Sequence, residues 1–153
     1  MEISYRIAGI DDLMIIAELW NLMCSTEENC GEDEYAEILI AGGEILTDPD
    51  KAMFIAFDGE KAAGYSYVYI RHECLWSDKR GPIGNLDTIY VRPDYRRQGI
   101  AQSLVAMCED WSREKDCVEI VSNCDLDNEG SFAFHTGIGF KELHRLIHFS
   151  KEL

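Results

Sequence analysis

The chain has 153 residues, which is long enough for one α/β domain with a substantial core and too short for two ordinary domains. We therefore expect a single domain over residues 1–153. Its apolar fraction of 46% and charged fraction of 28% are typical of a globular protein. A net charge of −15 argues against nucleic acid or an anionic membrane as partner, because both require basic patches, and favours a cationic ligand.

Three kinds of segment or site are not predicted. No apolar run approaches the roughly 20 residues that span a bilayer, so we expect no membrane partner. The N-terminus lacks the basic start and apolar stretch of a secretory signal, which predicts a cytoplasmic location. The six cysteines include no Cys-x-x-Cys pair and no histidine at zinc-ligand spacing, so we interpret them as reduced thiols and predict no metal site.

The first half of the chain predicts a strand, two helices and a hairpin. A strand over residues 2–8 precedes a helix that begins at Asp11-Asp12, and a second helix, interrupted at Gly42-Gly43, ends at Asp48-Pro49. Two apolar runs, residues 52–57 and 62–70, flank Asp58-Gly59, a dipeptide that favours a tight turn. Acidic residues gather between the two helices, at Glu27-Glu28 and Glu32-Asp33-Glu34.

The segment Leu86-Asp87-Thr88-Ile89-Tyr90-Val91 alternates as a strand does, and Pro93 marks its end. Simple alternation places Leu86, Thr88 and Tyr90 on one face and Asp87 on the other. Apolar residues then recur at helical spacing from Ile100 to Trp111, so the intervening segment lies where a strand becomes a helix. Such a turn offers unpaired amides to an anion, and Gly99 allows close backbone approach. Arg96 and Arg97 add positive charge, and the loop is predicted to bind phosphate.

The remaining elements complete an α/β (α+β) pattern. The helix after Gly99 is predicted to run to about Lys115, followed by a strand over residues 118–121, a short helix that opens at Asn128, and a last strand over residues 146–149.

Two motifs carry a resemblance to a known family. Arg96-x-x-Gly99-x-Ala101 resembles the loop of GCN5-related N-acetyltransferases (GNAT) whose amides hold the pyrophosphate of acetyl-CoA, and residues 128–140 resemble that family's C-terminal signature. The resemblance implies a central mixed, mostly antiparallel sheet of about six to seven strands flanked by about four helices. It also implies acetyl-CoA as acyl donor. The residues it assigns to acetyl-CoA are Ile89, Val91, Arg96, Arg97, Gln98, Gly99, Ile100, Ala101, Asn128 and His135.

Within that family the chain is most similar to the aminoglycoside 6'-N-acetyltransferases, on Leu86-Asp87-x-Ile89-Tyr90-Val91, Ser122-x-Cys124-x-x-x-Asn128 and Phe134-His135-x-x-x-Gly139-Phe140. This resemblance implies antibiotic resistance, a homodimer and a cationic acceptor amine. Position 87 is Asp where those enzymes carry Glu, and position 123 is Asn where they often carry Asp. Candidate acceptor-binding residues are Trp20, Glu27, Glu28, Tyr65, Asp87, Asn123 and Asp125.

Two residues are candidates for proton transfer. Asp87 would take the proton of the acceptor amine, and His135 would protonate the departing thiolate. Each has a structural alternative: Asp87 as the cap of a strand end and His135 as a half-buried histidine bonded to backbone. Asn128 is expected to contact the pantetheine, to cap its helix, or both. Trp20 and Tyr65 could equally be core aromatics.

The alternatives for function also stay open at this point. They are a GNAT enzyme acting on another small amine, a polyamine or a peptide amino terminus, and a non-catalytic acyl-CoA-binding sensor.

Overall fold

The computed structural model describes residues 2–25, 32–73 and 77–153. Within these ranges one sheet contains five strands in the order β1 (Ile3–Ile7), β2 (Lys51–Asp58), β3 (Lys61–Arg71), β4 (Ile83–Val91) and β5 (Glu119–Val121). The first four pair antiparallel, and β5 pairs parallel with β4. The α/β architecture with a mixed, mostly antiparallel sheet is as predicted, with fewer strands than the expected six to seven.

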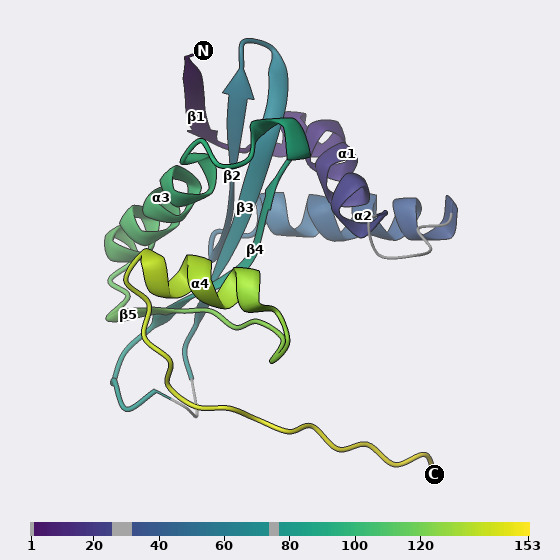
Figure 1. The fold of residues 1–153 in the computed structure, drawn as a ribbon. Coiled ribbons are helices and arrows are strands. Elements are labelled where there is room, and N and C mark those ends of the chain that lie inside the picture. The colour runs from purple at the N-terminus through teal and green to yellow at the C-terminus, as the bar shows by residue number, and fades with distance from the viewer. Residues whose placement is uncertain (1, 26–31, 74–76) are drawn as a thin grey trace.

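Helices cover both faces of the sheet (Figure 1). Helices α1 (Leu13–Cys24) and α2 (Glu32–Thr47) lie on one face, where Ile16 and Leu19 pack with Ile55 and Tyr65. Helix α3 (Ile100–Glu114) lies on the other face, and α4 (Glu129–Gly137) crosses the sheet beside β5. None of the helices in the described ranges is long and apolar enough to cross a membrane.

Cys108 belongs to the α3 side of the core, where it is fully buried among apolar side chains such as Leu104 and Val68. Burial raises the pKa of this thiol to about 12. It is therefore a neutral core residue, since a buried thiol packs as a small apolar side chain.

The predicted interruption of the second helix at Gly42-Gly43 is wrong, because α2 runs unbroken through both residues. A Cβ at Gly42 would lie 2.9 Å from Cδ1 of Leu13 on α1. The glycines thus allow close packing of two helices, and this packing outweighs their low helix propensity.

The predicted hairpin is confirmed. Asp58 pairs with Lys61 across the turn, and Gly59 adopts a φ of +60°, the conformation that favours glycine at this position.

The predicted alternation along β4 is wrong at Asp87. Thr88 pairs with Tyr67 of β3, but the next pair joins Leu86 to Val68, so Asp87 is the extra residue of a β-bulge. As a result Leu86 packs on the α3 side of the sheet and Tyr90 on the α1 and α2 side.

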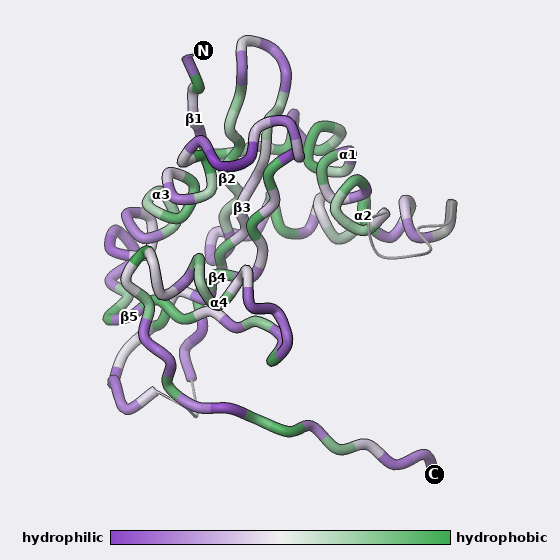
Figure 2. Tube along the Cα trace, in the orientation of Figure 1, coloured by the Kyte–Doolittle hydropathy of each residue, from purple (hydrophilic) through white to green (hydrophobic). Residues whose placement is uncertain are grey.

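The predicted strand over residues 146–149 is also not formed. The structure assigns no regular element after α4, and the segment from Lys141 to Leu153 runs away from the body (Figure 1). Hydrophobic and hydrophilic residues alternate along it (Figure 2), and Leu146, Ile147 and Phe149 are exposed. A strand needs a neighbour to accept its backbone hydrogen bonds, and no described part of this chain pairs with the segment.

Candidate active site

A wide cleft opens where β4 and β5 diverge. The two strands pair only from Ile83 with Glu119 to Asn85 with Val121, after which β4 continues to Val91 with β3 as its partner strand. The cleft has a volume of about 1110 Å³ and is lined by the outer part of β4, the loop before α3, the residues after β5, and α4. The diverging strands therefore create an opening that reaches the backbone of Ile89 and Val91, both of which line it.

The loop before α3 has the geometry of an anion site. Arg97 has a φ of +63° and Gly99 a φ of +79°, and an ideal Cβ at Gly99 meets nothing within 4 Å. Such left-handed positions turn successive N–H groups toward one side, and α3 begins directly after them. The amide of Ser103 donates to the carbonyl of Gly99 at 3.0 Å, so the amides of Ile100, Ala101 and Gln102 precede the first amide that donates within the helix. The residues present therefore fit a pyrophosphate.

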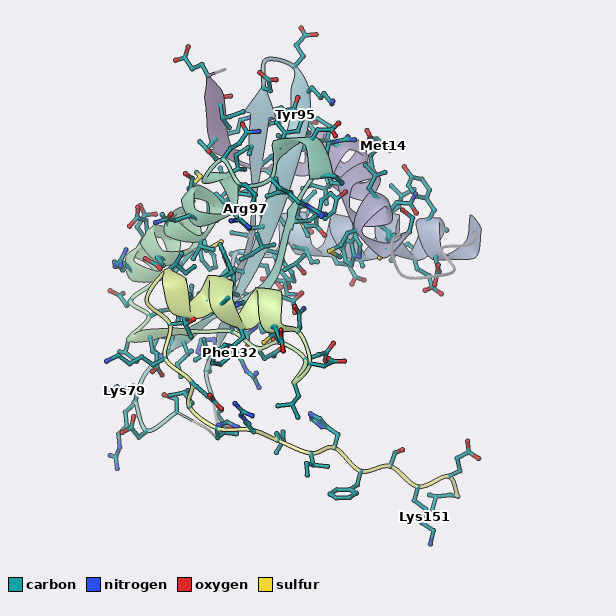
Figure 3. The ribbon with its side chains drawn as sticks, viewed as in Figure 1. Met14, Lys79, Tyr95, Arg97, Phe132 and Lys151 are labelled. Carbon is teal, nitrogen blue, oxygen red and sulfur yellow. The ribbon has the colours of Figure 1, made fainter. Side chains whose placement is uncertain are left out.

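Two arginines hold this loop in place. Arg96 folds back, and its Nε donates to the carbonyl of Val91 at 3.0 Å. Arg92 donates through Nε to the carbonyl of Ala62 at 2.7 Å and forms an ion pair with Glu18 of α1 at 2.6 Å. Arg97 begins the turn into α3, on the side of the sheet that α4 also covers (Figure 3). Positive charge, which an anionic ligand requires, therefore lies beside the loop in a protein that is strongly acidic overall.

Asp87 is exposed and lines the cleft at the bulge. One of its oxygens accepts a hydrogen bond from Oγ1 of Thr88 at 2.8 Å. Burial raises the pKa of Tyr65 and of Tyr67 well above the usual value, and the negative charge of Asp87 raises both further. The bulge thus turns a carboxylate toward the tyrosines of β3 and into the cleft, where a cation would meet it.

His135 lies on α4 with both ring nitrogens in contact with protein groups. Nδ1 lies 2.7 Å from the carbonyl oxygen of Ser131, and Nε2 lies 2.9 Å from Oγ of Ser122. The hydroxyl of Ser122 in turn donates to the carbonyl of Leu86 at 3.1 Å. Ser122 therefore connects α4 to β4 at the point where the strands diverge.

Asn128 caps α4, because its Oδ1 accepts a hydrogen bond from the amide of Ser131 at 3.0 Å. It also lines the cleft. The predicted capping role is confirmed, and the contact with pantetheine stays a prediction.

The structure brings most of the sequence-predicted residues to this one cleft. The predicted residues that line it are Asp87, Ile89, Val91, Arg96, Arg97, Gly99, Ile100, Ala101, Asn123, Asn128 and His135.

The remaining predicted residues lie elsewhere or are not described. Gln98 bonds the carbonyl of Asp94 at 3.3 Å and is not among the lining residues, and neither are Trp20, Tyr65 and Asp125. Trp20 packs against the α1 side of the core and Tyr65 is fully buried. Glu27 and Glu28 lie outside the described residues, and the side chains of Glu32 and Asp33 are likewise not described.

Ser122 and Met23 are two of the cleft residues that had no predicted role. Ser122 follows β5 directly, and the carboxyl end of a parallel strand is where α/β proteins commonly bind ligands, a signal that would have identified it. Met23 lines the cleft one helical turn after Trp20, and it accepts a hydrogen bond from the hydroxyl of Tyr65 at 3.8 Å. Nothing in its sequence context separates it from an ordinary core methionine.

Comparison with known proteins agrees with this geometry. An "Aminoglycoside N(6')-acetyltransferase type 1" of Acinetobacter baumannii is 33% identical over 111 residues, covering 72% of this chain and 76% of that protein. A protein of the same name from Klebsiella aerogenes is 33% identical over 146 residues, covering 92% and 88%. The structure of AAC(6')-Iy in complex with the bisubstrate analog CoA-S-monomethyl-acetylneamine superposes with a TM-score of 0.85 at 28% identity, covering 100% of both chains.

The sequence model described as the acetyltransferase (GNAT) family matches residues 16–140. That range contains the loop, the bulge and α4. The chain therefore belongs to the acetyltransferase (GNAT) family, whose enzymes use acetyl-CoA as acyl donor.

Proposed function

We propose that this protein transfers the acetyl group of acetyl-CoA to the 6'-amine of aminoglycoside antibiotics, and so confers resistance to them. The observation that carries the proposal is the bulge at Asp87, which turns an exposed carboxylate into the same cleft as the anion-binding loop. Relatives that cover most of the chain bear the name of this activity. The chain acts as one catalytic domain over residues 1–153.

The donor half of the site consists of backbone groups and an asparagine. Amides from Arg97 to Ala101 would hold the pyrophosphate at the beginning of α3. The open edge of β4 at Ile89 and Val91 would bond the pantetheine amides as a neighbouring strand does. Asn128, whose Oδ1 caps α4, would place its amide nitrogen toward the same arm.

The acceptor half supplies negative charge and a base. A primary ammonium with a pKa near 10.4 is free amine in only about one molecule in a thousand at neutral pH. Asp87 would take this proton directly or through water, since it is exposed at the bulge. Asp125 is exposed and follows β5, where it would attract a polycation from outside the cleft.

The remaining candidates for binding the acceptor support the proposal less strongly. Asn123 lines the cleft as a neutral polar contact. Tyr65 and Trp20 would support the pocket from behind through their packing around Met23. Glu27 and Glu28 stay candidates on their charge alone.

The test is a thiol-release assay with a matched pair of aminoglycosides, one with a 6'-amine and one with a 6'-hydroxyl. We expect turnover with the amine and none with the hydroxyl. Acetylation of polyamines or peptide amino termini in place of the 6'-amine would reject the aminoglycoside assignment and leave the transferase chemistry. Acetyl-CoA binding without turnover on any amine would favour the sensor.

Asn123→Asp examines the acceptor assignment from the protein side. A carboxylate at this position of the cleft would add an ionic contact to the sugar. We expect a lower KM for the 6'-amino aminoglycoside. An unchanged KM, with another amine acetylated well, would contradict the assignment.

We further propose that the enzyme is a cytoplasmic homodimer. The segment from Lys141 to Leu153 supports this, because it carries exposed apolar side chains and leaves the body of the protein (Figure 3, Lys151). A second copy would provide the strand neighbour that the described part of the chain does not offer to residues 146–149. Light scattering should give a dimer for the full chain and a monomer after deletion of residues 141–153, and a monomeric full chain would reject this proposal.

A further inference from the structure

The imidazole of His135 has no ring nitrogen available to a ligand in the cleft. Nδ1 lies 2.7 Å from the carbonyl oxygen of Ser131 and 3.3 Å from the hydroxyl of the same residue. The nearer carbonyl only accepts, so we assign a proton to Nδ1, which it donates to this carbonyl. Nε2 is occupied by the hydroxyl of Ser122 at 2.9 Å. A proton that leaves this ring toward the cleft therefore has to pass through Ser122.

The ring is also held in its orientation by its neighbours. The rings of Phe134 and Phe140 meet it edge-on, with centroids 5.7 Å and 5.3 Å away. Turning Nε2 toward the cleft would break two hydrogen bonds and both ring contacts. Direct donation by His135 is thus opposed by its packing.

The direction in which the hydroxyl of Ser122 donates depends on the charge of the His135 ring. Its hydroxyl has one proton and two neighbours that can accept it, the carbonyl of Leu86 at 3.1 Å and, in neutral histidine, Nε2. When His135 is an imidazolium, Nε2 donates to Ser122 and Ser122 donates to Leu86. When His135 is neutral, Ser122 donates to Nε2 and the carbonyl of Leu86 loses this donor. The direction of the hydroxyl therefore follows the protonation of the ring.

Ser122 also lies where a leaving group would need a donor. It lines the cleft as the first residue after the last paired position of β5, and the carbonyl that it bonds belongs to Leu86, next to the bulge. Of the described charged side chains, Asp87 of β4 and Arg96 and Arg97 of the loop line the same cleft. Asp87 would accept a proton in this cleft, whereas the hydroxyl of Ser122 can donate one to a ligand there when it turns from the carbonyl of Leu86.

We propose that Ser122 is the catalytic residue that protonates the departing thiolate and that His135 is a positioning residue that supplies the proton from behind. The relay starts with His135 as an imidazolium, and the free amine adds to the thioester carbonyl carbon and forms the C–N bond. As the C–S bond then breaks, its electron pair stays on sulfur, and the sulfur takes the hydroxyl proton of Ser122, which turns from the carbonyl of Leu86. Oγ takes the proton of Nε2 in the same step and ends as a donor to neutral His135. Solvent then reprotonates the ring. The ammonium loses two protons, one before it attacks and one as the amide forms, and both pass to solvent by way of Asp87. This inference rests on the proposed transferase function.

Kinetics of three variants test the relay. We expect Ser122→Ala to lower kcat/KM for the acceptor about 10²-fold, the lower end of the range for losing general-acid help. Ser122→Thr keeps a hydroxyl and should restore most of the activity. The matched control is Ser103→Ala on α3, a serine that does not line the cleft, with activity as in the wild type.

A double variant separates a relay from two independent effects. His135→Gln keeps an amide that can donate to Ser122 but has no proton to transfer, and we expect it to lose about as much as Ser122→Ala. In a relay the two changes remove the same step, so the double variant should lose about 10²-fold and not about 10⁴-fold. Multiplied losses would overturn the proposal.

The resting protein provides a readout that does not depend on activity. Nitrogen-15 NMR of neutral His135 should show the proton on Nδ1 and Nε2 as an acceptor. The Nε2 signal should change in Ser122→Ala and not in Ser103→Ala. A proton on Nε2 of the neutral ring would overturn the relay.

These outcomes separate the relay from the proposed function. Full activity of Ser122→Ala together with an impaired His135→Gln would overturn the relay and leave the function intact. If the enzyme acetylates another amine in place of aminoglycosides, the proposed acceptor fails, and the same measurements made with that amine still decide the relay.

Discussion

Gly99→Asp tests the assignment of the loop before α3 to pyrophosphate. The φ of +79° at this position costs a residue with a Cβ about 1 kcal/mol. A carboxylate at about 6 Å from a doubly negative pyrophosphate adds about 1.4 to 2.8 kcal/mol of repulsion for an effective dielectric constant of about 80 to 40. The sum is about 2.5 to 4 kcal/mol, so we expect the Kd for acetyl-CoA to rise about 10²-fold to 10³-fold.

Calorimetric titration with acetyl-CoA measures this change. Gly99→Asn is the matched control, because Asn has nearly the same shape and tolerates a positive φ but carries no charge. It should weaken binding at most about tenfold, since only the backbone strain of about 1 kcal/mol remains. The thermal unfolding of both variants should stay cooperative. An unchanged Kd in Gly99→Asp would refute the assignment, and equal losses in both variants would show that charge at this position is irrelevant.

Three further predictions concern the acceptor and the stability of the fold. Asp87→Asn should lower kcat/KM for the acceptor about 10²-fold to 10⁴-fold with calorimetric affinity for acetyl-CoA unchanged, and full activity would make this carboxylate structural. The acceptor KM should rise when salt is raised well above physiological levels, because added ions screen the acidic site; a constant KM would rule out charge as the basis of recognition. Asp12→Asn should lower the free energy of unfolding by about 1 to 3 kcal/mol at pH 7, because hydrogen bonds of 2.7 Å from Arg6 hold the pKa of Asp12 below its usual value. This contribution is present above the unfolded pKa near 3.9 and is lost as the pH falls through the lower folded pKa, so denaturation curves of the two proteins should converge in acid and not at neutral pH.

Local patterns in the sequence determined the loop and most of the elements. The change from alternating to helical spacing around Gly99 marks a strand that becomes a helix, and any such turn exposes amides to an anion. Asp58-Gly59 determines its hairpin because the positive φ at Gly59 is a property of one residue. These features depend on neighbouring residues only, which is why they could be read without a structure.

Features that depend on distant residues were decided by the tertiary structure. The bulge at Asp87 arises from the pairing of β4 with β3, so alternation along β4 alone gave the wrong face for Leu86. The glycines of α2 are tolerated because Leu13 of another helix packs against them. The segment over residues 146–149 has the composition of a strand, but a strand forms only where a partner accepts its hydrogen bonds.

The residues of the site likewise divide into those that the sequence identified and those that only the tertiary structure identified. Residue types and spacing identified Asp87, His135 and the loop, because each has a recognisable chemistry in the sequence. The link between His135 and Ser122 joins α4 to the end of β5, with a hydrogen bond of 2.9 Å across a turn and a helix. A serine has no distinctive sequence signal, and it acquires a role only when folding brings an imidazole to one side of it and a cleft to the other.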